Sequence, residues 1–255
     1  RDRIPAAFAP ALLALMVCLA LLAQPQQAQA QAYATPAKQA ILIDGEIGTV
    51  LFEKDSLKRF PPASLAKLMT MEVVFNALKS GRLSLTDTFY VSEHAWRTGG
   101  ATSGGSTMFA AVKSEVPLED LIRGVVIQSA NDGCIIIAEG MAGSEAAFAG
   151  LMNERAKAIG LTDSHFTNPT GLPDEAQYVT ARDLATLTQH MIREYPEYLR
   201  YYSELEFTWN KIKQRNRNPL LAMDIGADGM KTGYTEASGY AIVGTVRRDN
   251  RRLVA

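Results

Sequence analysis

The chain has 255 residues, of which 47% are hydrophobic and 21% are charged, so disorder, collagen and coiled coil are excluded as descriptions of the whole chain. Its 26 Lys and Arg residues balance 27 Asp and Glu residues, and the formal net charge of −1 excludes the strongly basic surface expected of a nucleic-acid-binding protein. The two cysteines are too few for a disulfide scaffold.

The first thirty residues have the pattern of a secretory signal peptide. A start with two arginines precedes an apolar run over residues 6–23, which is interrupted by Pro10. This run is shorter and richer in Ala than the span of about 20 apolar residues that crosses a membrane. Two overlapping Ala-x-Ala sites follow and end at Ala30 and Ala32. We therefore expect residues 1–30 to be a cleaved signal peptide, with an uncleaved anchor as the alternative, and the protein to be exported.

Removal of this segment leaves Cys134 as the single cysteine of the mature chain, so an internal disulfide is excluded. Cys134 begins the apolar run 134–138. A thiol in such a run is predicted to be buried and inert.

The first predicted elements of the mature chain are a hairpin and a central helix. Apolar segments at residues 40–43 and 49–52 flank a turn sequence and predict a β-hairpin. After two prolines, residues 64–79 predict one helix that is apolar on most faces and therefore lies in the core. Residues 98–106 contain four glycines and predict a loop.

The middle of the chain is predicted to be helical. Residues 118–126 have helical spacing, and a further helix begins at Ser144 and ends at Gly160. Residues 161–178 form a long predicted loop, and a capping box in its looser form, Thr180-Ala-Arg-Asp183, begins the next helix.

Strands return at the end of the sequence. From Phe207 the pattern is typical of strands, residues 240–246 are a strong β run, residues 248–250 a turn, and Leu253 begins another strand. Helices in the middle and strands at both ends predict an α+β fold, in which a helical cluster packs on an antiparallel sheet built from both ends of the chain.

Three short motifs carry candidate chemistry. They are S-x-x-K at residues 64–67, S-x-N at 129–131 and K-T-G at 231–233. Each alone has a structural explanation, as a helix cap or as a strand end with a turn glycine. Chance occurrence of all three in this order is on the order of a few per cent.

The residue types suit nucleophilic catalysis. Ser64 and Lys67 lie three positions apart and so share one face of a helix. A serine hydroxyl needs a base to remove its proton, and an amine is a base only if its pKa is lowered by burial or by a second cation such as Lys231. Ser129 and Asn131 alternate on a short loop, so the hydroxyl can relay a proton and the amide can hold a substrate amide.

The ordered motifs resemble those of the penicillin-binding proteins and serine β-lactamases. The segments at 62–70, 121–132, 216–218 and 228–234 narrow this resemblance to the low-molecular-weight D-alanyl-D-alanine carboxypeptidases, serine peptidase family S11. The resemblance covers residues 38–255. It implies a β-lactamase/transpeptidase-like fold, with the site where the helical cluster meets a five-stranded antiparallel sheet.

The resemblance also implies a reaction in cell-wall biogenesis and in the control of cell shape. Ser64 would attack the penultimate carbonyl of a peptidoglycan stem pentapeptide, release the terminal D-alanine, and form an acyl-enzyme that water hydrolyses. Lys67 resembles the general base, and Ser129 resembles the proton relay to the leaving amine. β-Lactam antibiotics would acylate Ser64 as covalent inhibitors. No metal or organic cofactor and no nucleic acid is implied.

The remaining motif residues resemble substrate-binding groups. Asn131 resembles the residue that holds the acyl amide, and Lys231 and Thr232 resemble the group that meets the terminal carboxylate. The backbone N–H of Tyr234, with that of the nucleophile, would form the oxyanion hole. The strand that contains Gly233 would pair with the substrate backbone as an added strand.

Some features depart from the relatives. The middle motif is S-A-N where many members have S-G-N, and the S-D-N and E-x-x-L-N segments of class A β-lactamases are missing, which argues against a dedicated β-lactamase. A D,D-endopeptidase or β-lactamase that uses the same site, and a wall-binding protein without turnover, remain alternatives.

Family members usually continue past residue 255 with a β-rich domain and a membrane-anchor helix. Residues 31–255 are therefore expected to be a catalytic domain truncated before its last elements, and the missing C-terminal segment could give peripheral membrane association. Export predicts a location in the periplasm or on the outer face of the cytoplasmic membrane.

Overall fold

The computed structural model describes residues 33–255, so the expected signal peptide and both of its cleavage sites lie outside the described residues. Contacts divide the chain into two units, Arg1–Pro36 and Ala37–Ala255. All the elements below belong to the second unit.

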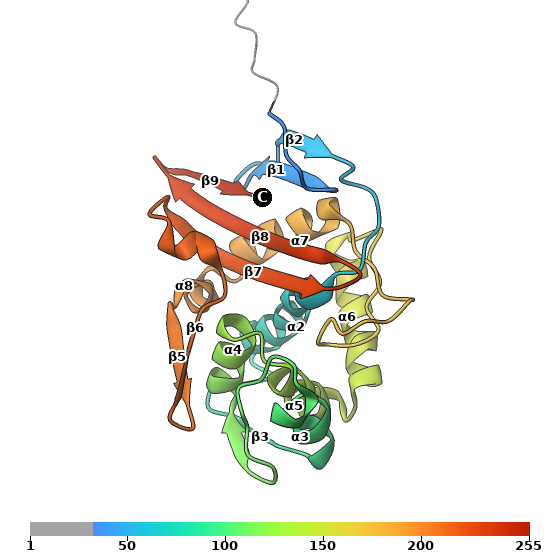
Figure 1. The fold of residues 1–255 in the computed structure, drawn as a ribbon, viewed down its shortest axis with the longest axis vertical. Helices are drawn as coiled ribbons and strands as arrows, with labels where there is room; N and C mark the ends of the chain where they lie inside the picture. The colour runs from blue at the N-terminus through green and yellow to red at the C-terminus, as the bar shows by residue number, and fades with distance from the viewer. Residues whose placement is uncertain (1–32) are drawn as a thin grey trace, which may run out of the picture. The chain divides into compact units, whose positions relative to one another are not determined.

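A five-stranded antiparallel sheet joins the two ends of this unit (Figure 1). The hairpin β1 (Ala40–Asp44) and β2 (Val50–Lys54) comes first in the chain, and β7 (Ala227–Thr235), β8 (Gly239–Arg248) and β9 (Arg251–Val254) come last. The spatial order is β2-β1-β9-β8-β7, so β9 pairs with β1 on one side and with β8 on the other. The predicted hairpin and the sheet built from both ends are confirmed, and β7 is an edge strand.

The helices lie between these strands in the sequence. They are η1 (Ala63–Ala66), α2 (Lys67–Lys79), α3 (Glu93–Thr98), η2 (Ala101–Ser103), α4 (Leu118–Ile127), α5 (Asn131–Ala142), α6 (Glu145–Ile159), α7 (Ala181–Glu194), η3 (Pro196–Tyr198), α8 (Arg200–Ser203) and η4 (Pro219–Ala222). Two small ribbons complete the unit: β3 (Thr88–Tyr90) with β4 (Glu115–Pro117), and β5 (Glu206–Trp209) with β6 (Ile212–Arg215). Figure 1 shows α7 and α8 behind the sheet.

Helix α2 is the centre of the core, as its sequence predicts. Leu68, Met69, Val74 and Phe75 are fully buried, and each such side chain stabilises the fold by roughly 1.5–3 kcal/mol relative to an exposed one. Glu72 is a buried charged residue in the middle of this helix. Its carboxylate accepts hydrogen bonds from the Arg155 guanidinium on α6 and from the Tyr195 hydroxyl that follows α7. These charge-assisted bonds fasten α2 to its neighbours.

Helix ends follow the local sequence. The Ser144 hydroxyl oxygen accepts the Ala147 N–H at the start of α6, and Gly160 ends this helix at φ 89°. The Thr180 hydroxyl oxygen likewise accepts the Asp183 N–H at the start of α7. A capping box also predicts that the Asp183 carboxylate accepts the Thr180 N–H. This part of the prediction is wrong, because the carboxylate accepts instead from the Asp163 N–H and the Ser164 hydroxyl of the long loop.

Two predicted boundaries also need correction. The single helix expected over residues 64–79 is the 3-10 turn η1 followed by α2. The loop expected over residues 98–106 includes the last residue of α3 and the 3-10 turn η2. In both places a 3-10 turn, which is wound more tightly than an α-helix, lies beside candidate site residues.

The predicted burial of Cys134 on α5 is confirmed, and burial raises the pKa of its thiol to about 12. The thiol therefore stays protonated at neutral pH. Within the described part of the chain, no single helix has the length and apolar character needed to cross a membrane. Helices α5 and α6 meet that requirement only together, and they are bent by 84° at their junction.

Candidate active site

Ser64 lies where two backbone segments press against η1. The preceding residue, Ala63, has φ 48°, which is strained for a residue with a side chain. A Cβ built on Gly233 of β7 would lie 3.2 Å from the Ser64 nitrogen, and one built on Gly171 would lie 1.8 Å from the Ala63 carbonyl oxygen. Glycine at both positions therefore lets β7 and the loop approach the candidate nucleophile.

Lys67 is the first residue of α2 and faces Ser64, as the three-residue spacing predicts. Its Nζ lies 3.0 Å from Ser64 Oγ and 2.9 Å from Asn131 Oδ1, and it also donates to the Thr170 carbonyl oxygen. The side chain is 1% exposed. Burial lowers the pKa of Lys67 to about 8, and the Arg217 guanidinium also lowers it. A substantial fraction of this amine is therefore neutral near pH 8.

A second lysine–serine pair faces the first. Lys231 Nζ of β7 lies 3.0 Å from Ser129 Oγ and 3.0 Å from the Thr232 carbonyl oxygen. Ser129 lies between α4 and α5 with φ 61°. Burial, and then the charge of Lys67, hold the pKa of Lys231 well below its ordinary range.

The sequence suggested burial and a second cation such as Lys231 as the causes that lower the pKa of Lys67. Burial is the main cause, and Arg217 is a cation that contributes. Lys67 and Lys231 also interact, since the charge of Lys67 lowers the pKa of Lys231. Arg217 lies just after β6 and donates to Ser106 Oγ. The sequence assigned no role to Arg217, whose only signal is its place in the segment at 216–218.

Asn131 is placed with the two pairs, although it is the first residue of α5 rather than a loop residue. Its backbone N–H donates to the Ser106 carbonyl, and its side-chain oxygen accepts from Lys67. The side-chain nitrogen faces Gly105, where a Cβ would lie 3.0 Å away. The next residue, Asp132, fixes this region because its buried carboxylate accepts from Thr107 Oγ1 and from the N–H groups of residues 108 and 110. The three motifs are thus brought together at one place.

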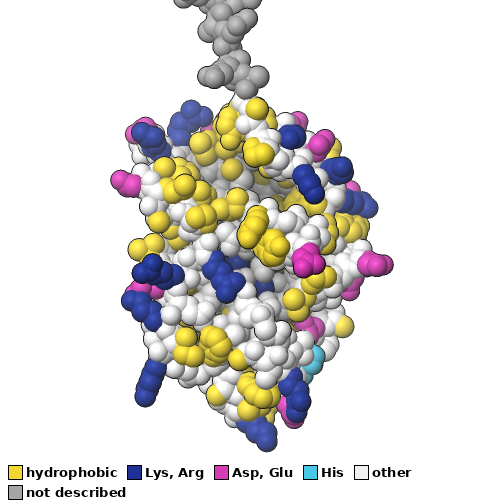
Figure 2. Space-filling model, viewed as in Figure 1, with side chains coloured by type: hydrophobic (Ala, Val, Ile, Leu, Met, Phe, Trp, Pro, Cys, Tyr) yellow, Lys and Arg dark blue, Asp and Glu magenta, His cyan; other side chains and the backbone are white. Residues whose placement is uncertain are grey.

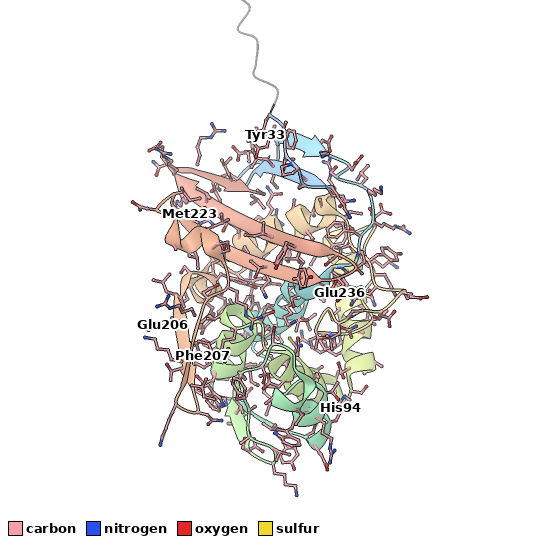
Figure 3. All side chains as sticks on the ribbon, in the orientation of Figure 1. Tyr33, His94, Glu206, Phe207, Met223 and Glu236 are labelled. Atoms are coloured by element: carbon pink, nitrogen blue, oxygen red, sulfur yellow. The ribbon has the colours of Figure 1, made fainter. Side chains whose placement is uncertain are left out.

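The edge strand β7 forms the other wall. Lys231 and Gly233 are buried and face the helices, whereas Tyr234 is 55% exposed and packs against Tyr240 with 4.5 Å between the ring centroids. Figure 3 labels Glu236, which lies in the turn that joins β7 to β8. Figure 2 shows basic side chains in the middle of the same face, with hydrophobic side chains beside them.

The donor set does not suggest a metal centre. Among residues 33–255, no group of three or more His, Cys, Asp or Glu side chains is arranged to hold a metal ion. The groups that converge on Ser64 are amines, hydroxyls, an amide and backbone carbonyls. Such groups can transfer protons and hold a peptide.

Acylation of Ser64 is expected to depend on pH through Lys67. The amine removes a proton only in its neutral form, and its pKa is about 8. The acylation rate constant should therefore fall about tenfold for each pH unit below that pKa and level off above it. Stopped-flow acylation with a chromogenic cephalosporin between pH 5 and 10 measures this profile. A rate that stays flat from pH 5 to pH 8 would contradict a base with this pKa.

Comparison with known proteins gives a consistent result. The family model for peptidase S11, D-alanyl-D-alanine carboxypeptidase, matches residues 25–255. The chain is 43% identical over 227 residues to D-alanyl-D-alanine carboxypeptidase DacC of Escherichia coli (strain K12), which covers 88% of this chain and 57% of the relative. It is 41% identical to DacA of Haemophilus influenzae over 91% of this chain and 57% of that protein. The chain thus spans about half the length of these curated relatives.

Solved structures agree in fold. Penicillin binding protein 5 from Haemophilus influenzae matches with a TM-score of 0.82 and 41% identity, over 87% of this chain and 66% of that one. Penicillin-Binding Protein D2 from Listeria monocytogenes in the ampicillin-bound form matches with a TM-score of 0.73 and 29% identity, over 87% and 88% of the two chains. The penicillin-binding-protein fold expected from the motifs is confirmed, and the chain belongs to peptidase family S11, the D-alanyl-D-alanine carboxypeptidases.

Proposed function

We propose that this chain is the catalytic region of a serine-type D-Ala-D-Ala carboxypeptidase, which removes the terminal D-alanine from peptidoglycan stem pentapeptides. One observation carries the proposal: Ser64 Oγ lies 3.0 Å from a buried amine whose pKa is lowered to about 8. This pair can generate an alkoxide-like nucleophile at neutral pH without a histidine. Family membership supplies the class of substrate.

Acylation follows from this geometry. Neutral Lys67 accepts the Ser64 proton as Ser64 Oγ bonds to the penultimate carbonyl carbon. The carbonyl oxygen becomes an oxyanion, which the backbone N–H groups of Ser64 and Tyr234 stabilise. The close approach of Gly233 to the Ser64 nitrogen supports this pairing, because it places the adjacent β7 backbone beside Ser64.

Departure of D-alanine needs a proton for the leaving nitrogen. The Ser129 hydroxyl donates it and is reprotonated from Lys231, whose Nζ lies 3.0 Å away. The acyl amide is held by Asn131 and by the free edge of β7. The proton held by Lys67 then returns to Lys231, so that Lys67 is neutral again. Water attacks the ester carbonyl, Lys67 takes the proton of this water and passes it to Ser64 Oγ as the acyl–oxygen bond breaks, and free Ser64 returns.

β-Lactams are proposed to enter the same pathway. Their strained amide presents a carbonyl to Ser64 and a carboxylate to the basic side of the site, where Lys231 and Arg217 lie. The relative with bound ampicillin supports this assignment. The resulting ester would be the covalent adduct.

Product analysis distinguishes the proposal from its alternatives. The purified protein is incubated with a stem pentapeptide, with a cross-linked peptide dimer and with benzylpenicillin, and products are followed by mass spectrometry. We expect equimolar D-alanine and tetrapeptide from the pentapeptide. Cleavage of the dimer alone would identify an endopeptidase, rapid turnover of penicillin alone a β-lactamase, and binding without any product a wall-binding protein.

Lys231 is expected to recognise the free carboxylate of the substrate. A charge-assisted contact is worth about 1.5–3 kcal/mol, or roughly 10- to 150-fold in rate. Lys231→Gln should therefore lower kcat/KM on the free acid by about that factor or more. A C-terminal amide on the substrate should cost the wild type a similar factor, and the two losses should not add.

The exposed Lys213→Gln variant on β6 is the control for this cycle and should change neither value, because Lys213 pairs with Glu206 away from the motifs. Fully additive losses would show that Lys231 does not contact the carboxylate. Its role would then be electrostatic support of Lys67.

Export is proposed from the first thirty residues. We expect the exported protein to begin near residue 31 or 33, because the Ala-x-Ala sites end at Ala30 and Ala32. N-terminal sequencing of protein recovered from the periplasm or from the outer face of the cytoplasmic membrane measures this. A retained apolar segment, residues 11–23, would instead establish an uncleaved anchor.

A further inference from the structure

We propose that Asn168 is a positioning residue for the general base and acts through the Thr170 carbonyl. The inference rests on the proposed function, since it concerns how Lys67 deprotonates Ser64. The starting point is the long loop between α6 and α7. Of the three hydrogen bonds of the Lys67 amine, one goes to this loop, and its acceptor is the carbonyl oxygen of Thr170.

The neutral Lys67 amine has two N–H groups and one lone pair. Two of its three neighbours, Asn131 Oδ1 and the Thr170 carbonyl oxygen, can only accept hydrogen bonds. They therefore take both N–H groups and leave the lone pair for the third neighbour, Ser64 Oγ, at 3.0 Å. Loss of either acceptor lets the amine rotate and donate to Ser64, and a donating amine is not a base.

Asn168 fixes the direction of the Thr170 carbonyl. Its Oδ1 accepts from the Gly171 N–H at 2.8 Å, from the Thr170 N–H at 3.2 Å and from Thr170 Oγ1 at 2.8 Å. The Gly171 N–H and the Thr170 carbonyl belong to one planar trans peptide, in which they point in opposite directions. Anchoring the N–H on Asn168 therefore turns the carbonyl toward Lys67.

Other residues hold the rest of the loop. Asn153 on α6 accepts the Phe166 N–H and donates to the Phe166 carbonyl. Gln177 and Thr70 fasten neighbouring backbone groups of the loop. Removal of the Asn168 side chain should therefore loosen the turn at residues 168–172 and leave the loop in place.

The test compares three variants by stopped-flow acylation with a chromogenic cephalosporin, which separates the noncovalent affinity from the acylation rate constant. Asn168→Ala should lower the acylation rate constant roughly 10- to 100-fold, the cost of a misplaced catalytic group, with the affinity unchanged. Asn168→Asp keeps the accepting oxygen and should restore most of the rate. Asn153→Ala, which loosens the same loop at residue 166, should keep the wild-type rate.

The pH profile supplies a readout that loss of stability alone would not change. The titratable and charged groups around Lys67 are the Asp132 carboxylate and the Cys134 thiol on α5, Arg217 after β6, and Lys231 on β7. None of them changes in these variants. Loss of an acceptor favours the neutral amine, so Asn168→Ala should move the midpoint to lower pH, whereas the added charge of Asn168→Asp should move it to higher pH.

Either of two results would overturn the inference. One is an unchanged acylation rate constant in Asn168→Ala. The other is an equal loss of this rate constant in Asn168→Ala and Asn153→Ala, with the midpoint of the pH profile unmoved in both. Absence of any acylation in the wild type is a separate result, since it would reject the proposed function. Melting temperatures of all variants confirm that each is folded at the assay temperature.

Discussion

Ser64→Ala is expected to abolish both the covalent β-lactam adduct and the release of D-alanine. Ser64 Oγ is the group that would form the acyl bond, and its side-chain hydrogen bond joins it to Lys67. Removal of one oxygen leaves the backbone of η1 intact, so the fold and the noncovalent binding of substrate should persist. The loss in kcat should be on the order of 10⁶-fold, as for the deleted serine nucleophile of another hydrolase.

Intact mass spectrometry after incubation with benzylpenicillin measures the adduct, and peptide mapping of the wild type locates it. Ser144→Ala is the matched control, since Ser144 caps α6 and lies outside the three motifs. It should cost about 1 kcal/mol of stability and label normally. An adduct that survives in Ser64→Ala would show that the nucleophile is another residue.

Lys67→Arg is expected to be nearly inactive although it keeps the positive charge. A guanidinium does not lose a proton at any working pH, so it cannot accept the proton of Ser64. The side chain is buried and donates to oxygens of Asn131 and Thr170. We expect a loss of about 10³-fold or more in the acylation rate constant, because a base contributes on the order of 10²- to 10⁴-fold.

Lys79→Arg on the same helix is the control. Lys79 is near the surface and pairs with Glu194, an interaction that arginine retains, so this variant should acylate at the wild-type rate. Near-normal acylation in Lys67→Arg would reject the base role and leave Lys67 as a structural cation. Retention of the wild-type melting temperature in both variants would assign any loss to chemistry.

The sequence predicted the parts of this fold that depend on local patterns. The hairpin at residues 40–54, the buried helix that follows Ser64, and the helix that ends at Gly160 all have periodicity or caps that act over a few residues. The three motifs were brought together as their order implied. The short helices α3 and α8 have too few residues for a periodic signal in the sequence, and they were not predicted.

Other parts of the site could not be predicted because their contacts join distant segments. A cation that lowers the pKa of Lys67 is Arg217, which follows β6 in the sequence and donates to Ser106 Oγ, far from Lys67 along the chain. The contribution of Thr170 is a backbone carbonyl, so its side chain gives no sign of it. The capping-box motif at Thr180 was half right, because Asp183 found partners in a loop that only the folded chain brings near.

The position of β9 has a consequence for the order of folding. This strand, near residue 255, lies between β1 and β8, and so the early hairpin has no place in the sheet until β9 is present. The helices and the β7–β8 hairpin can collapse earlier through contacts between near neighbours, whereas β1 pairs across almost the whole unit. Contacts between such distant segments form slowly. A population of molecules with an unpaired edge on β9 should therefore precede the native state, and a chaperone that covers that edge would raise the yield.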